Sequence, residues 1–122
     1  MAILIESTAK NYSAGTRSIT SDRIAVGVTL ARITCTREAP WPADAGEVIE
    51  AHLELSLDDG ATWRYLAGFW AAGGPIYTRG LIETHASLLE IALRDPSNAV
   101  RRARATVANS VALRTAITVE VW

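Results

Sequence analysis

A chain of 122 residues, with 49% hydrophobic and 20% charged residues, can bury one core, which excludes a disordered protein. A formal net charge of −1 gives no long-range attraction to nucleic acid or to an anionic membrane, so we expect neither partner. The single cysteine, Cys35, excludes an intrachain disulfide and a zinc cluster built from cysteines. The N-terminus lacks the pattern of a signal peptide, and no apolar run approaches the roughly 20 residues of a membrane span. We therefore expect a protein made in the cytoplasm.

The N-terminal segment is the least regular part of the chain. Residues 10–21 are small and polar, which predicts an irregular arm over residues 1–21 ahead of one domain at residues 22–122. Residues 24–35 are rich in β-formers, but the apolar alternation changes phase, and this predicts a bulge near Ala31. Residues 37–46 contain two prolines and a glycine and predict a loop.

A hairpin is predicted in the middle of the chain. From Ile49 to Leu57, five apolar residues alternate with four polar ones, which is the pattern of a strand with one wet face. Asp58-Asp59-Gly60-Ala61 supplies turn chemistry, since aspartate bonds its own backbone and glycine tolerates positive φ. Residues 62–69 then return as the partner strand, which ends at Gly73-Gly74-Pro75.

The turn of this hairpin carries a motif of five positions, S-x-D-x-G-x-T-W, formed by Ser56, Asp58, Gly60, Thr62 and Trp63. It resembles the Asp-box, the hairpin motif that is repeated around sialidase-type propellers. The resemblance implies that the aspartate binds turn amides, that the threonine supports them, and that the tryptophan packs in the core. The family's catalytic residues have no counterpart here, and a single box in a chain of this length excludes a propeller.

The C-terminal third contains further strand patterns. Residues 75–87 leave open a short strand at 76–78 and a helical turn at 81–86. Residues 88–108 predict a second hairpin around Asp95-Pro96-Ser97-Asn98, because proline presets φ for a turn. The final strand, from Leu113, is expected to run to Trp122.

Seven or eight strands with turns about every ten residues predict an all-β antiparallel sandwich. We expect a jelly-roll-like order, because longer irregular connections separate the hairpins. An immunoglobulin-like order is the alternative, and the strand order itself stays open.

Catalytic chemistry has little support in the sequence. His52 and His85 are the only histidines, and the side chains of Glu50, His52 and Glu54 stand roughly 6.5–7 Å apart along a strand, which is wide for one metal ion. Neither a nucleophile elbow nor a glycine-rich phosphate loop occurs. We therefore expect a protein that is not an enzyme and uses no metal or cofactor.

Aromatic and basic residues are the candidates for contact with partners. Trp41, Trp70 and Tyr77 predict a contact surface, which could stack on sugar rings or pack at a subunit interface. Arg102 and Arg104 lie on a polar strand face, where cross-strand pairs with glutamates are favoured over binding of phosphate. An electrostatic contact with an acidic partner is also compatible with them.

The general character of the chain resembles small bacteriophage virion proteins. That resemblance implies a non-catalytic structural protein of the phage particle, for head decoration or tail association. Its expected partners are copies of itself, with a trimer favoured, and a larger assembly such as a capsid or tail; its expected location is the virion. A small carbohydrate-binding module is the alternative.

Overall fold

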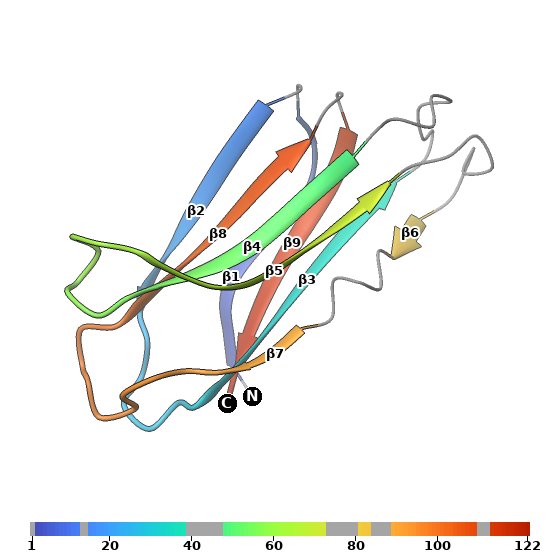
Figure 1. Cartoon of the computed structure of the whole chain (residues 1–122). Helices are drawn as coiled ribbons and strands as arrows, with labels where there is room; N and C mark the ends of the chain where they lie inside the picture. Colours follow the sequence, from blue (N-terminus) through green and yellow to red (C-terminus); the bar gives the residue numbers. More distant parts are fainter. Residues whose placement is uncertain (1, 13–14, 39–47, 73–80, 84–88, 110–112) are drawn as a thin grey trace.

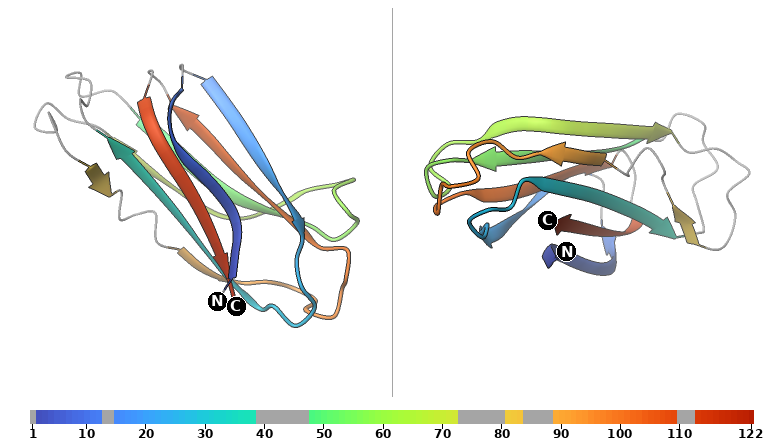
Figure 2. Two further views of the ribbon diagram at one scale, coloured as in Figure 1. Left: turned by 180° about the vertical axis from the view of Figure 1, so that it is seen from behind. Right: turned by 90° about the horizontal axis from the view of Figure 1, so that it is seen from below.

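The computed structural model describes residues 2–12, 15–38, 48–72, 81–83, 89–109 and 113–122, which form nine strands in two antiparallel sheets. The sheets stack face to face as a sandwich (Figures 1 and 2). The five-stranded sheet contains β1 (Ala2–Tyr12), β9 (Leu113–Val121), β3 (Leu30–Glu38), β6 (Leu81–Glu83) and β7 (Leu89–Ala92). The four-stranded sheet contains β2 (Gly15–Arg23), β8 (Arg102–Asn109), β4 (Val48–Ser56) and β5 (Arg64–Ala72).

The strand order is that of a jelly roll. β4 pairs with β5, β3 with β6 and β7, β2 with β8, and β1 with β9, all antiparallel. The chain therefore folds back on itself about the β4–β5 turn as one long nested hairpin, which rolls up so that successive pairs alternate between the two sheets. The orders β1-β9-β3-β6 and β2-β8-β4-β5 follow directly from this nesting. The predicted jelly-roll sandwich is confirmed, and so is the predicted hairpin over residues 49–69.

The core lies between the sheets and is built from alternate residues of the inner strands. On β4 and β8, the inward residues are Ala51, Leu53, Leu55, Ala103, Ala105 and Val107. On the opposing sheet, the buried residues are Ile5, Ala31, Ile33, Ile117, Val119 and Val121. Each fully buried Leu, Ile or Val contributes about 1.5–3 kcal/mol of transfer free energy.

The predicted N-terminal arm is wrong where the structure describes it. Residues 2–12 are β1, and Ile5 is part of the core. Residues 15–23 are β2, which pairs with β8 and packs Ile19 against the core. Its small polar side chains, such as Ser18 and Thr20, are exposed. A strand of short polar residues with one apolar contact has a loop-like composition, so only its pairing identifies it as a strand.

Two further predictions about strands are wrong. There is no bulge near Ala31, because β3 and β9 stay in register from Ala31 to Glu38; the phase change marks the end of the loop at residues 24–29. Residues 88–108 are not a hairpin either. β7 pairs with β3, whereas β8 pairs with β2 and β4, so the segment at 93–101 crosses from one sheet to the other.

The remaining predictions for loops are only partly covered. Residues 81–83 form β6 and not a helical turn. Residues 76–78 and most of the predicted loop at 37–46 lie outside the described residues, although Arg37 and Glu38 belong to β3. The last strand ends at Val121, and Trp122 continues its pairing through backbone hydrogen bonds to Leu30.

Candidate functional site

The outer face of the four-stranded sheet carries a row of polar and aromatic side chains. Because Leu53 and Ala105 point into the core, their neighbours Glu54 and Arg104 point outward. The register places Glu54 opposite Arg104, and His52 opposite Thr106. On the edge strand β5, Tyr65 is the partner of Glu54.

Glu54 is the centre of a hydrogen-bond network on this face. Its Oε1 accepts from His52 Nε2 and from Thr106 Oγ1, both at 2.8 Å, and its Oε2 accepts from Arg104 Nη2. Burial tends to raise the pKa of Glu54, but the hydrogen bonds from Arg104, Thr106 and His52 outweigh it and lower the pKa to about 2. The Oγ atom of Ser18 lies 2.9 Å from Thr106 Oγ1 and extends the network to β2. The carboxylate is therefore ionised at neutral pH and balanced by Arg104.

Two aromatic rings flank this network. The guanidinium of Arg104 lies over the Trp63 ring, 4.5 Å from its centroid, which is a cation–π contact. The Tyr65 ring is tilted against His52, with centroids 5.5 Å apart, and its residue is 64% exposed. Trp63 is half-buried on this face, so the packing in the core that the Asp-box resemblance implied for it is not observed.

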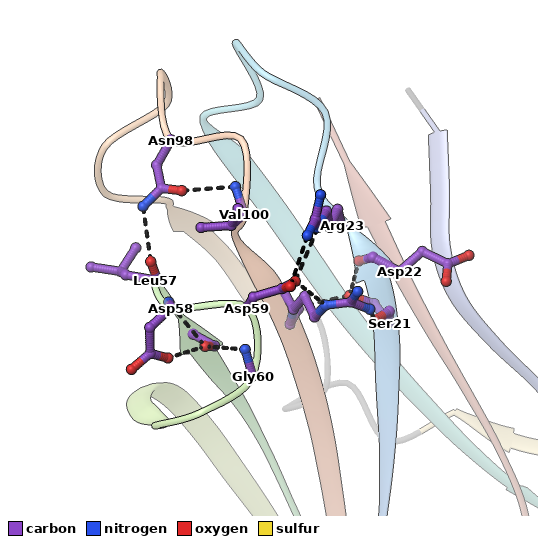
Figure 3. Close-up of polar contacts among 12 residues, drawn as sticks. Ser21, Asp22, Arg23, Leu57, Asp58, Asp59, Gly60, Asn98 and Val100 are labelled. Carbon is purple, nitrogen blue, oxygen red and sulfur yellow. Dashed lines mark hydrogen bonds and ion pairs between the residues drawn. The ribbon is translucent and has the colours of Figure 1, made fainter.

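Hydrogen bonds join Ser56, Asp58, Gly60 and Thr62 of the motif in the β4–β5 turn, of which Asp58 and Gly60 are labelled in Figure 3. The Oγ of buried Ser56 accepts from the amide of Gly60 at 2.8 Å and donates to Asp58 Oδ1 at 2.7 Å. Asp58 accepts from both the amide and the hydroxyl of Thr62. These bonds from Thr62, together with that from Ser56, lower the pKa of Asp58 to about 2. Asp59 and Gly60 both have positive φ, which closes the turn.

Asp59 connects this turn to the neighbouring strands. Its carboxylate accepts two hydrogen bonds from Arg23, at 2.8 and 3.0 Å, and one from Arg102 at 2.8 Å (Figure 3). The hydrogen bond from Arg23, and then that from Arg102, holds the pKa of Asp59 well below its usual range. The β4–β5 turn is thereby fastened to β2 and β8.

A buried arginine organises the same end of the sandwich. The side chain of Arg101 has no exposed surface and donates to the backbone carbonyls of Asn98, Val28, Ala25 and Pro96 at 2.8–3.2 Å. Asn98 in turn donates to Leu57 O and accepts from Val100 N (Figure 3). The loops at residues 24–29, 57–62 and 94–101 are thus joined through backbone groups, which makes this end structural.

The outer face of the other sheet carries an apolar group where the two chain ends lie side by side (Figures 1 and 2). Ile3, Leu30 and Trp122, here called the terminal patch, are 54%, 39% and 37% exposed. Ile3 pairs with Glu120, two residues before Trp122, and Leu30 hydrogen-bonds to the Trp122 backbone. The register shift between Ile3 and Ile5 turns Ile3 outward while Ile5 enters the core. The Arg32 guanidinium lies 4.7 Å from the centroid of the Trp122 ring.

The structure places only some of the contact residues that the sequence suggested. Trp41 and Tyr77 lie outside the described residues, and Trp70 is placed only as the β5 partner of Glu50. Arg104 pairs with Glu54 across strands, as the sequence interpretation favoured, whereas Arg102 pairs with Asp59.

Sequence reasoning did not select Tyr65 or Arg101 as important. Tyr65 alternates in phase with other apolar and aromatic residues of its strand, so the sequence does not set it apart. Arg101 is adjacent to Arg102, which faces outward, so the sequence does not show which of the two is buried. Only the register and the tertiary contacts distinguish them. Among the described residues, no group of three or more His, Cys, Asp or Glu side chains could hold a metal ion, and no helix is long and apolar enough to cross a membrane.

Comparisons with known proteins give no family. No family model and no curated protein matches the chain. Among solved structures, the Eiger TNF from S. frugiperda is 11% identical, with a TM-score of 0.47, and the match covers 97% of this chain and 92% of that one. The carbohydrate-binding module TmCBM61, solved with β-1,4-galactotriose, is 15% identical, with a TM-score of 0.40 and coverage of 93% and 69%. The VP2 subviral particle of infectious bursal disease virus is 16% identical, with a TM-score of 0.35 and coverage of 93% and 29%. All three scores lie below 0.5, so these likenesses do not bear on function.

Proposed function

We propose that the chain is a non-catalytic structural protein of a bacteriophage particle, associated with its head or tail. It associates with copies of itself, as a trimer, and docks on a larger protein lattice. The observation that carries the proposal is the terminal patch, where two apolar side chains and a tryptophan are exposed together on one sheet face. Exposed apolar groups of this kind are typical of protein interfaces, where tryptophan is enriched.

The surroundings of the terminal patch also suit a protein interface. β1 is at the end of the five-stranded sheet, so its outer edge is open among the described strands. Arg32 and Glu120, 3.9 Å apart, supply a polar border next to Trp122. The formal net charge of −1 leaves little repulsion between copies. A second copy can therefore cover apolar surface without a large electrostatic penalty.

The polar residues near the β4–β5 turn support a structural role. The carboxylates of Glu54, Asp58 and Asp59 each accept at least two hydrogen bonds, and their low pKa values keep them ionised. A general acid or base needs a pKa near the working pH. None of these three groups has one, which favours a non-catalytic protein.

Size-exclusion chromatography with light scattering over a wide concentration range tests the association. We expect the wild type to form a discrete trimer, and the double variant Ile3→Lys with Trp122→Ala to be monomeric at concentrations at which the wild type is assembled. Val26→Lys is the matched control, because Val26 is 62% exposed in the loop at 24–29 and lies outside the terminal patch. A double variant that assembles as the wild type does would contradict the use of this patch.

The virion assignment needs a separate measurement. Mass spectrometry of phage particles purified from the source should detect the protein at a constant copy number per particle, and an antibody against it should label their surface. Purified particles that lack the protein would rule out the virion assignment even if the trimer forms in solution.

A further inference from the structure

Tyr65 occupies an unusual position on the outer face of the four-stranded sheet. A Cβ atom added to Gly68 would lie only 2.8 Å from the Tyr65 hydroxyl and 2.7 Å from the His52 Cβ. Because Gly68 has no side chain, the tyrosine side chain has space to lie beside His52. The ring is held against the histidine, with 64% of the residue exposed, on the edge strand β5. An exposed aromatic ring in a defined orientation is suited to stacking on a ligand.

A row of polar groups leads from this ring across the sheet. In register order it runs from Gly68 on β5 to His52 on β4, Thr106 on β8 and Ser18 on β2. Four neighbouring strands span about 14 Å. The hydroxyls of Ser18 and Thr106 are hydrogen-bonded to each other at an exposed position, and each oxygen retains capacity for another partner. We call Tyr65, His52, Thr106 and Ser18 the Tyr65 strip.

The charges next to the strip limit the kind of ligand. Glu54 is neutralised by Arg104, and both of its oxygens already accept hydrogen bonds. The guanidinium of Arg104 also covers the Trp63 ring, so this cation already contacts both a carboxylate and an aromatic ring. Glu50, on the same face one step along β4, is exposed and repels anions. The strip therefore suits an uncharged ligand that offers both a flat apolar face and hydroxyl groups.

We propose that the Tyr65 strip binds a neutral oligosaccharide. One sugar ring stacks on Tyr65, and hydroxyl groups of the next ring bind His52, Thr106 and Ser18. This site is independent of the proposed assembly, because the terminal patch lies on the outer face of the other sheet. A particle protein with both surfaces holds its lattice with one face and a glycan with the other.

Isothermal titration calorimetry on the full chain tests the proposal. The probes are cellotetraose, xylotetraose, mannotetraose, β-1,4-galactotetraose and chitotetraose, with a heparin tetrasaccharide as the anionic comparison. We expect at least one neutral probe to bind, and Tyr65→Ala to weaken that binding by about tenfold or more, the loss of one central contact. Tyr65→Phe, which keeps the ring, should stay within about threefold of the wild type. Val26→Ala, an exposed change outside the strip, should leave the affinity unchanged.

Three results would overturn the proposal. They are binding to no neutral probe, binding to the heparin fragment alone, and binding of a neutral probe that Tyr65→Ala leaves intact. Thermal melts of each variant show whether it is folded before titration. The variant Ile3→Lys with Trp122→Ala should bind the sugar as the wild type does, so the failure of the assembly proposal and the failure of the glycan proposal are distinguishable.

Discussion

Two polar regions of this sandwich contain similar residues that have different roles. At the loop end, Arg101 donates to four backbone carbonyls and has no exposed surface. On the face of the four-stranded sheet, Arg104 pairs with the Glu54 carboxylate, stacks on Trp63 and is half-buried. Arg101 binds backbone groups and holds loops together. Arg104 binds another side chain across strands, and the neighbouring Tyr65 stays exposed to solvent on the same face. The first region stabilises the fold, and the second is where we propose that a ligand binds.

The two arginines also differ in how they tolerate change. Burial lowers the pKa of Arg101, and its charge is balanced by carbonyl dipoles and by nearby Asp95. Its removal would take one hydrogen-bond donor from each of four backbone carbonyls in a part-buried region. Removal of a partner on the sheet face leaves groups that water can reach, so the expected loss is smaller.

The largest expected effect comes from Arg101→Met. The change keeps much of the volume but takes the arginine donor from the carbonyls of Asn98, Val28, Ala25 and Pro96. The Ala25 and Pro96 carbonyls still accept from backbone amides, so the loss falls mainly on Asn98 and Val28. We expect the free energy of unfolding, measured by urea denaturation, to fall by about 3 kcal/mol or more. Arg94→Met, which changes an exposed arginine of the same crossing segment, should lose less than about 0.5 kcal/mol. Equal losses in both variants would contradict a special role for Arg101.

Acid should weaken both regions, because each contains carboxylates with a lowered pKa. The pKa of Glu54 falls from 4.5 to about 2 and that of Asp58 from 3.8 to about 2. Between these values the unfolded chain binds more protons than the folded one, so stability is complete above about pH 4.5 and is lost as the pH falls toward 2. Urea midpoints measured across this range should fall steadily.

The variant Glu54→Gln isolates the contribution of the sheet face. It should lower the stability at pH 7 by about 1–2 kcal/mol and make the acid slope shallower, because one of the shifted groups is gone. A slope identical to that of the wild type would show that Glu54 does not contribute to the acid response.

Apart from the control Arg94→Met, the smallest expected effect comes from Tyr65→Ala. Because 64% of the residue is exposed, its removal should change the free energy of unfolding by less than about 1 kcal/mol. Thermal melts of the variant and of the wild type provide the comparison. A loss as large as that from Arg101→Met would show that the ring is part of the fold and not an open surface.

The candidate site was predictable only in part. Strand alternation alone places Glu54 and His52 on one wet face, and the same rule suggests cross-strand pairing with Arg104. The network itself depends on register, because Thr106 and Ser18 are distant in sequence and meet His52 and Glu54 only when β8 lies between β2 and β4. The placement of the Tyr65 side chain depends further on Gly68, because a side chain at that position would clash with it. This requirement can be seen only after the strands are paired.

The sequence by itself determined the secondary-structure type, the hairpin at the β4–β5 turn and the sandwich class. These follow from local alternation and from turn residues such as Asp58 and Gly60, whose preferences need no distant partner. The tertiary structure alone decided that β1 and β2 join the sheets, that β7 and β8 separate, and that Arg101 is buried. These outcomes depend on pairing between residues far apart in the chain, where the free energy comes from burial and hydrogen bonds that no local pattern contains.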